Sequence, residues 1–285
     1  MIFLTKLPIT KMHGLGNSYV IVRDLDKALE RKPGYKNLAI ALSDKSYGVG
    51  SDGILVVQLG VKTEYRMRIF NPDGSEAEMC GNGIRMFAKN LYDEGLVKET
   101  QFSVETYDGS RVVVPKLNIR NSEVESVTVD MGKGEIKERD KTIKLPQRDF
   151  YGTSVSVGNP HYVIFDSLAT EEITKQYGQL IENHHDFQPN RTNVEFARVK
   201  NPSHIDLFVW ERGAGFTKAC GTGACATAFA GYKKRINERD VKIWLPGGAL
   251  FISVMNDDTI KMNGPAEYIF KGKIIDLDQL LSHFR

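Results

Sequence analysis

The sequence has 285 residues, and at about 150 residues per domain this length predicts two domains. Its 41% hydrophobic and 26% charged residues are typical of a soluble globular protein and exclude a wholly disordered chain. Lys and Arg number 38 against 36 Asp and Glu, so the net charge of +2 gives no electrostatic footprint for nucleic acid or an anionic membrane.

The first 14 residues contain a few apolar side chains but lack the basic region, long apolar core and cleavage site of a signal peptide. We interpret them as a first β-strand in a cytoplasmic protein. The uncharged stretch from Ala219 to Tyr232 is shorter than the roughly 20 apolar residues that cross a bilayer. The sequence therefore predicts no membrane span.

Short apolar or alternating runs, separated by turn residues, predict a chain made mostly of strands. These runs are Gly16–Val22, Gly53–Val57, Tyr65–Phe70, Val124–Met131, Gly158–Phe165 and Ile205–Trp210. Two peripheral helices are expected over Leu38–Ser46 and Glu171–Glu182. A third helix follows Cys80 and stops at Gly95. A fourth, over Ala224–Ala230, is apolar on every face, which predicts a helix buried inside a curved sheet.

The chain repeats itself at half its length. Gly-Asn enters a strand at Asn17 and again at Asn159, 142 positions later, and Cys-Gly-x-Gly begins at Cys80 and again at Cys220, 140 positions later. Agreement of two landmarks in order and spacing predicts an α+β fold of two pseudo-symmetric, β-rich domains, each a barrel-like sheet wrapped around a central helix. We place the domains at 1–122 with 267–285, and at 123–266.

Cys80 and Cys220 each stand at the predicted start of a central helix. A helix start has unpaired N–H groups and a partial positive charge, which stabilise a thiolate and bind a carboxylate. If the two starts face one anion, two sulfurs flank it from opposite sides. This geometry suits inversion of an amino-acid Cα, in which one thiolate removes the proton from one face and the other thiol protonates the opposite face.

Other interpretations of the cysteines and nearby motifs stay open. A papain-like nucleophile needs one Cys and one His, and the duplication argues against it. A redox pair is the runner-up, since facing thiols could form a disulfide. Cys225 is expected to be a buried, inert residue. The sequence Gly221–Ala226 matches a dinucleotide fingerprint only weakly, because no buried strand precedes it.

Metal and nucleic-acid sites are not predicted. The three cysteines form no C-x-x-C, and the six histidines show no zinc-ligand spacing. His184 and His185 lie in a polar stretch and are interpreted as solvated surface. The basic run Lys233–Arg235 suits the end of a helix, where cations complement the dipole.

At these residues the chain strongly resembles the diaminopimelate epimerases, which belong to a superfamily of cofactor-independent racemases and epimerases. The segments that carry the resemblance are His13–Asn17, Gly50–Gly53, Asn71–Ser75, Met79–Gly83, Gly158–His161, Arg191–Val194, Glu211–Gly215 and Cys220–Gly223. The resemblance implies interconversion of LL- and meso-diaminopimelate on the bacterial route to lysine and cell-wall peptide, without pyridoxal phosphate or a metal. A related proline or hydroxyproline epimerase is the alternative, and a non-enzymatic thiol switch is a third hypothesis.

By motif, the resemblance makes Cys80 and Cys220 the acid–base pair, with His161 and Glu211 tuning the cysteine pKa values. It also implies a set of substrate contacts: Asn17, Asn71, Gly81, Asn82, Asn159, Asn193, Glu211, Arg212, Gly221 and Thr222. Some family members use Gln as a substrate contact where this chain has Gly53, which has no side chain to make that contact. A homodimer is the family's usual assembly, and the expected partner is a small amino acid.

Overall fold

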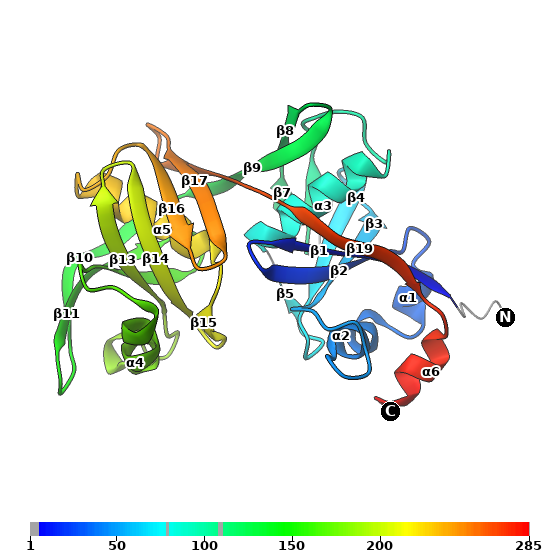
Figure 1. Ribbon diagram of the computed structural model, residues 1–285, viewed down its shortest axis with the longest axis horizontal. Coiled ribbons are helices and arrows are strands. Elements are labelled where there is room, and N and C mark those ends of the chain that lie inside the picture. The colour runs from blue at the N-terminus through cyan, green and yellow to red at the C-terminus, as the bar shows by residue number, and fades with distance from the viewer. Residues whose placement is uncertain (1–5, 78–79, 108–110, 285) are drawn as a thin grey trace. The chain divides into compact units, whose positions relative to one another are not determined.

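The computed structural model describes residues 6–77, 80–107 and 111–284. The chain divides into two compact units, Met1–Val129 with Pro265–Arg285 and Asp130–Gly264 (Figure 1). Met79 of the first cysteine motif and the first five residues of the predicted N-terminal strand lie outside the described residues.

The sheet of the first unit has the strand order β19-β1-β2-β3-β4-β6-β7, with β5 beside β4. Its strands are β1 (Leu7–Gly14), β2 (Asn17–Arg23), β3 (Ile54–Leu59), β4 (Tyr65–Phe70), β5 (Glu76–Ala77), β6 (Val104–Thr106), β7 (Arg111–Val113) and β19 (Glu267–Ile274). The last of these comes from the far end of the chain and pairs antiparallel with β1, as the red and dark blue ribbons of Figure 1 show.

Helices cover both faces of this sheet. The helix α3 (Gly81–Asp93) contacts β1, β2, β3 and β4 on one face. On the other face, α2 (Tyr35–Ser43) and α6 (Leu277–Ser282) share a core cluster with Val20, Val22, Ile54 and Val56. The short α1 (Ala28–Arg31) adds Leu29 to this cluster. Since side chains alternate along a strand, the residues that alternate with these four point toward α3.

The second unit repeats this plan. Its sheet runs β10-β11-β12-β13-β14-β16-β17-β18, with β15 beside β14. The strands are β10 (Glu135–Lys144), β11 (Asp149–Ser156), β12 (Pro160–Phe165), β13 (Asn193–Asn201), β14 (His204–Glu211), β15 (Gly215–Thr217), β16 (Asp240–Leu245), β17 (Gly248–Val254) and β18 (Thr259–Gly264). The hairpin of β8 (Lys116–Arg120) and β9 (Glu123–Lys133) precedes these strands in the chain and continues the same sheet, with β9 beside β18.

The central helix of the second unit is α5 (Gly221–Lys233), which contacts β11, β12, β13, β16, β17 and β18, so the sheet wraps around it. The helix α4 (Glu171–Glu182) packs on the opposite face, followed by a 3₁₀ turn at His185–Phe187. Both halves have the same parallel pairs, β2–β3 with β12–β13 and β4–β6 with β14–β16. The predicted α+β fold of two pseudo-symmetric halves around central helices is confirmed.

One predicted helix is displaced along the chain. The expectation over Leu38–Ser46 corresponds to α2 at Tyr35–Ser43, three residues earlier. The displacement has a local cause, because the Asp44 carboxylate accepts from the N–H groups of Ser46 and Tyr47 and turns the chain out of the helix.

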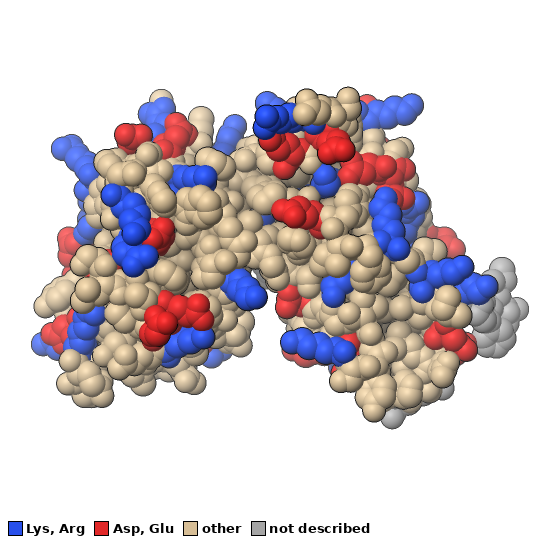
Figure 2. Space-filling model, viewed as in Figure 1, with Lys and Arg blue, Asp and Glu red and all other residues tan. Residues whose placement is uncertain are grey.

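Within the part of the chain that the structure describes, every helix is too short or too polar to cross a lipid bilayer. Figure 2 shows cationic and anionic side chains intermixed over the face in view, in keeping with the near-balance of charge.

Candidate active site

The two predicted catalytic cysteines begin their helices in the same way. Cys80 and Cys220 are N-cap residues with extended backbone, at φ −138° and −126°. In each, the sulfur accepts a hydrogen bond from the N–H of the third residue of the helix, Gly83 or Gly223, at 3.3 Å. The cysteine side chain therefore does what Ser or Asp does at an ordinary N-cap, and the positive end of the helix faces the sulfur.

In the first unit, a buried cation supports the helix start. Arg85 is 0% exposed and donates to the Gly81 carbonyl at 3.0 Å and to Asn82 Oδ1 at 2.8 Å. The amide of Asn82 then donates to Asn17 Oδ1 at 3.1 Å. The predicted contact residues Asn17 and Asn82 are thus joined beside Cys80, and the Tyr19 hydroxyl donates toward the sulfur itself.

Asn71 lies in the turn between β4 and β5, where its side-chain amide donates to Ser75 Oγ at 3.0 Å. Gly53 has φ +140°, and a Cβ at this position would lie 2.3 Å from the Phe70 carbonyl oxygen. Only glycine fits this backbone, so position 53 offers no side-chain contact to a substrate.

In the second unit, a chain of polar side chains leads to the helix start. His161 is 1% exposed and places Nε2 at 2.9 Å from Asn159 Oδ1. The Asn159 amide donates to Thr222 Oγ1 at 3.4 Å, and this hydroxyl lies 3.6 Å from Cys220 Sγ. The predicted residues His161, Asn159 and Thr222 therefore form one connected group next to Cys220.

Glu211 stands at the end of β14 and accepts from the Thr217 hydroxyl. Burial raises the pKa of its carboxyl, while hydrogen bonds from Thr217 and Cys220 oppose the rise. Glu211 is thus placed to accept the thiol proton of Cys220 in a hydrogen bond.

The side-chain amide of Asn193 forms hydrogen bonds to backbone groups of the protein. It donates to the Pro160 carbonyl at 2.8 Å and accepts from the Arg212 backbone N–H at 2.9 Å. Asn193 thereby fixes the backbone of Arg212, whose exposed guanidinium donates to the Asn190 carbonyl at 2.8 Å. The structure brings these two predicted residues together, with Asn193 acting as a brace.

A cavity of about 420 Å³ in the second unit is lined by Asn159, His161 and Arg212, together with Ser156, Asn190 and Thr192. Its lining combines a cation with hydroxyl and amide groups, which suits a small polar ligand with a carboxylate.

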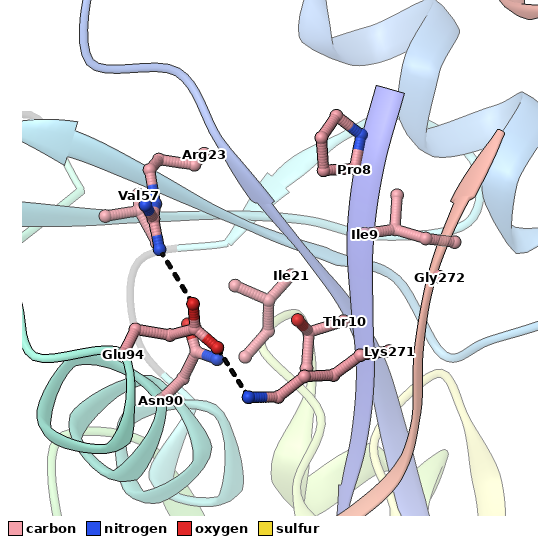
Figure 3. Close-up of a pocket in the computed structure, with 10 residues that line it drawn as sticks. All are labelled: Pro8, Ile9, Thr10, Ile21, Arg23, Val57, Asn90, Glu94, Lys271 and Gly272. Atoms are coloured by element: carbon pink, nitrogen blue, oxygen red, sulfur yellow. Dashed lines mark hydrogen bonds and ion pairs between the residues drawn. The ribbon is translucent and has the colours of Figure 1, made fainter. Parts of the chain in front are cut away.

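A second cavity, of about 400 Å³, belongs to the first unit but contains none of the predicted site residues. Asn90 and Glu94 border it at the far end of α3 from Cys80, and Figure 3 shows Glu94 between Arg23 and Lys271, at 3.3 and 2.5 Å. Its charged groups are paired with one another, so we assign it no role in the site.

The two thiols differ in their electrostatic surroundings. Burial raises the pKa of Cys80. The Gly83 N–H, the Tyr19 hydroxyl and the Arg85 guanidinium each act to lower it and oppose this rise. Burial raises the pKa of Cys220 well above its ordinary value, and the carboxyls of Glu211 and Glu195 raise it further. Cys220 is therefore the more firmly protonated of the two.

Among the described residues, one group has the composition of a metal site, namely His184, His185 and Asp186. His185 and Asp186 are exposed, and Lys141 Nζ lies 3.2 Å from the Asp186 carboxylate, where it competes with a metal ion. None of the predicted site residues belongs to this group. His184 is half-buried rather than fully solvated as the sequence suggested.

Sequence reasoning missed Tyr19, Arg85, Glu195 and Thr217. A signal for one of them was present, because Tyr19 lies 142 positions before His161, the spacing that relates Asn17 to Asn159. The others have no such signal, since their importance depends on which side of a helix or strand is covered. Cys225 is 0% exposed within α5, as expected of a structural residue.

Comparison with known proteins identifies the family of this chain. The family model described as diaminopimelate epimerase matches residues 9–137 and 153–269. A diaminopimelate epimerase of Desulfitobacterium hafniense is 42% identical over 286 aligned residues, covering 95% of this chain and 99% of the relative. Another, from Bacillus licheniformis, is 40% identical and covers 93% of this chain and 96% of its own.

Solved structures with the same fold are more distant in sequence. A hydroxyproline epimerase from Agrobacterium vitis, with bound trans-4-hydroxy-L-proline, has a TM-score of 0.71 at 14% identity, covering 94% of this chain and 91% of its own. A Bacillus anthracis phenazine biosynthesis protein of the PhzF family has a TM-score of 0.72 at 14% identity, covering 94% and 98%. The structures support the fold, and the sequence matches place the chain in the diaminopimelate epimerase family of isomerases.

Proposed function

We propose that this protein interconverts LL- and meso-2,6-diaminopimelate by inverting one Cα, with Cys80 and Cys220 as the two acid–base residues. The observation that carries the proposal is the matched pair of helix starts, each capped by a cysteine sulfur at 3.3 Å from a glycine N–H. Family membership supplies the substrate. The reaction serves the biosynthesis of lysine.

The chemistry balances with one thiolate and one thiol. The thiolate takes the Cα proton and becomes a thiol, while the C–H electron pair moves into the α-carboxylate as enolate-like charge. The second thiol then protonates the opposite face of Cα and is left as a thiolate. Each turnover exchanges the protonation states of the two sulfurs, and the reverse reaction restores them.

Backbone N–H groups are the proposed stabilisers of the developing charge. In each central helix, the first N–H groups have no carbonyl partner within the helix, and those of Gly81, Asn82, Gly221 and Thr222 stand beside the cysteines. Such preorganised donors favour the carbanionic state more than the ground state. The reaction requires both sulfurs to reach opposite faces of one carbon.

The polar residues of the site are the proposed contacts of the substrate's charged groups. Arg212 can hold a carboxylate through its planar guanidinium, and Glu211 provides an anion for an ammonium group. Asn17, Asn71 and Asn159 offer both donors and acceptors. A substrate with a carboxylate and an ammonium at each end matches this mixture of charges.

The test is incubation of the protein with LL-diaminopimelate in heavy water, followed by chiral separation and mass analysis. We expect meso-diaminopimelate that carries deuterium at the inverted carbon. A parallel incubation with proline and trans-4-hydroxyproline should show no exchange. Exchange on the ring amino acids without exchange on diaminopimelate would contradict the proposal and favour the related epimerases.

We also propose a cytoplasmic location and a homodimeric assembly, both supported by family membership alone. Light scattering of the purified protein tests the assembly, and a mass near that of one chain would contradict it.

A further inference from the structure

A buried carboxylate lies behind His161 and has no assigned role. Glu195, on β13, is 0% exposed, and its Oε1 is 2.6 Å from His161 Nδ1. Its Oε2 is buried and has no hydrogen-bond partner among the residues that the structure describes. A Cβ on Gly223 would come within 3.0 Å of Oε1, so the carboxyl group also abuts the start of α5.

Another buried glutamate that pairs with a basic side chain shows which hydrogen bonds a buried carboxylate has in this protein. Glu105, in the first unit, is 0% exposed and binds Arg66 at 2.8 Å through Oε2, while Oε1 accepts from the N–H groups of Val61, Lys62 and Thr63. Glu195 has one imidazole on Oε1 and one backbone N–H, that of Tyr162, acting on its carboxyl, which is a weaker set of donors than that of Glu105. Burying an oxygen without a hydrogen bond costs less free energy when it is the carbonyl of a neutral carboxyl group than when it is part of a charged carboxylate.

The hydrogen bonds of His161 indicate where its protons lie. Asn159 Oδ1 can only accept, so Nε2, at 2.9 Å from it, carries a hydrogen. Two arrangements then remain at Nδ1. Either Glu195 is protonated and donates to the Nδ1 lone pair, or Nδ1 carries a hydrogen and donates it to the Glu195 carboxylate. In both cases one proton lies between the two groups, and the pair as a whole is neutral.

The other half of the molecule supplies an internal control. Leu55 on β3 pairs with Ile21 and Ile69, as Glu195 on β13 pairs with Val163 and Val209, so the two residues are equivalent. Leu55 also abuts its helix start, at 3.2 Å from the Cβ position of Gly83. The fold therefore accepts leucine at this place, and the carboxyl occurs only in the half that has His161 where the other has Tyr19.

We propose that Glu195 is a positioning residue that shares one proton with His161 and thereby holds Nε2–H against Asn159. Asn159 Oδ1 is then occupied, and its amide is turned to Thr222 beside Cys220. The inference rests on the proposed function, in which Cys220 and Asn159 act on the substrate.

The kinetic test compares Glu195→Gln with Glu195→Leu. Glutamine imitates the protonated carboxyl and can donate to Nδ1, so kcat/KM should stay within about threefold of the parent. Leucine reproduces the other half but cannot donate, and kcat/KM should fall by about tenfold or more through loss of positioning. Equal loss in both variants would mean that the negative charge is needed, and an unaffected Leu variant would mean that the group positions nothing.

The spectroscopic test uses ¹⁵N-histidine-labelled protein without substrate, with the His161 signals identified by their loss in His161→Phe. We expect Nε2 to carry hydrogen in the parent and in Glu195→Gln, and both tautomers to be populated in Glu195→Leu. A bare Nε2 in the parent would overturn the proposal. Because no turnover is needed, this result is independent of whether diaminopimelate is the substrate.

Glu105→Gln is the matched control, since it neutralises an equally buried carboxylate in the other unit. It should lower the free energy of unfolding while the His161 signals stay unchanged. If Glu105→Gln alters the His161 tautomer as Glu195→Leu does, the effect reflects general loosening of the fold and the proposal fails.

Discussion

The starts of α3 and α5 have the same backbone and different charges around it. Both place a cysteine sulfur on the N–H of the second glycine. Behind Cys80 lies the guanidinium of Arg85, whereas Cys225 takes the corresponding place in α5, 140 positions later. Beside Cys220 lie the carboxyls of Glu211 and Glu195. The two halves therefore share the same backbone donors but differ in the pKa of their thiols.

This comparison ranks the two thiols by their pKa. Burial raises the pKa of both thiols, but the Arg85 guanidinium and the Tyr19 hydroxyl oppose the rise at Cys80, whereas the neighbouring carboxyls add to the rise at Cys220. Of the two thiols, Cys80 is therefore the one that gives up its proton more readily.

The largest expected effect comes from removing either sulfur. Cys80→Ala and Cys220→Ala should each lower epimerisation by roughly 10³-fold or more, because each removes one of the two proposed proton-transfer groups. Cys225→Ala, in the same helix as Cys220, should keep near-parental activity. Full activity in either of the first two variants would contradict a two-base reaction.

Arg85→Met should have the next largest effect. It leaves the Gly81 carbonyl, Asn82 Oδ1 and the Pro265 carbonyl without their donor, and the free energy of unfolding should fall by about 2–4 kcal/mol. Chemical denaturation measures the loss. A change below about 1 kcal/mol would show that the cation is not needed to hold this helix start.

The order of thiol alkylation tests the inequality directly. At neutral pH, iodoacetamide should modify Cys80 before Cys220, since the pKa of Cys220 is raised more and its side chain is 4% exposed. Peptide mass spectrometry gives the two rates. Glu211→Gln should lower the pKa of Cys220 and speed its alkylation severalfold, and a slower reaction would contradict the assigned direction.

The smallest effect concerns acid stability. Burial alone would raise the pKa of Glu105. Arg66 and three backbone N–H groups outweigh this effect and lower the pKa from 4.5 to about 2. Because the folded-state pKa is the lower one, this contribution is present above pH 4.5 and is lost as the pH falls toward 2. Urea midpoints of the parent and Glu105→Gln should therefore converge on acidification. Curves that stay parallel would show that Glu105 is not the responsible group.

Much of the framework could be predicted because it depends on local pattern and on the repeat. Strands such as Tyr65–Phe70 and the helix Glu171–Glu182 lie where the periodicity places them. The helix starts follow from glycines after a cysteine. The end of α3 near Gly95 follows from the positive φ of 69° that glycine accepts there.

The supporting charges could not be predicted, because their burial depends on how many sides of an element are covered. Arg85 lies off the apolar stripe of α3 and looks solvent-facing in the sequence, but a sheet curves around this helix and leaves it 0% exposed. Glu195 alternates with Val194 and Phe196, a pattern typical of a half-exposed strand. Here α4 covers one face of the sheet and α5 the other.

The position of β19 has a consequence for synthesis on the ribosome. The edge of β1 stays unpaired until Glu267–Ile274 has emerged, after every residue of the second unit. A nascent chain halted before this point already contains both cysteine motifs, yet it lacks the strand that closes the first sheet and the Pro265 carbonyl that binds Arg85. Such a fragment would expose an open strand edge, so it should be a target for chaperones or aggregation rather than a half-active enzyme.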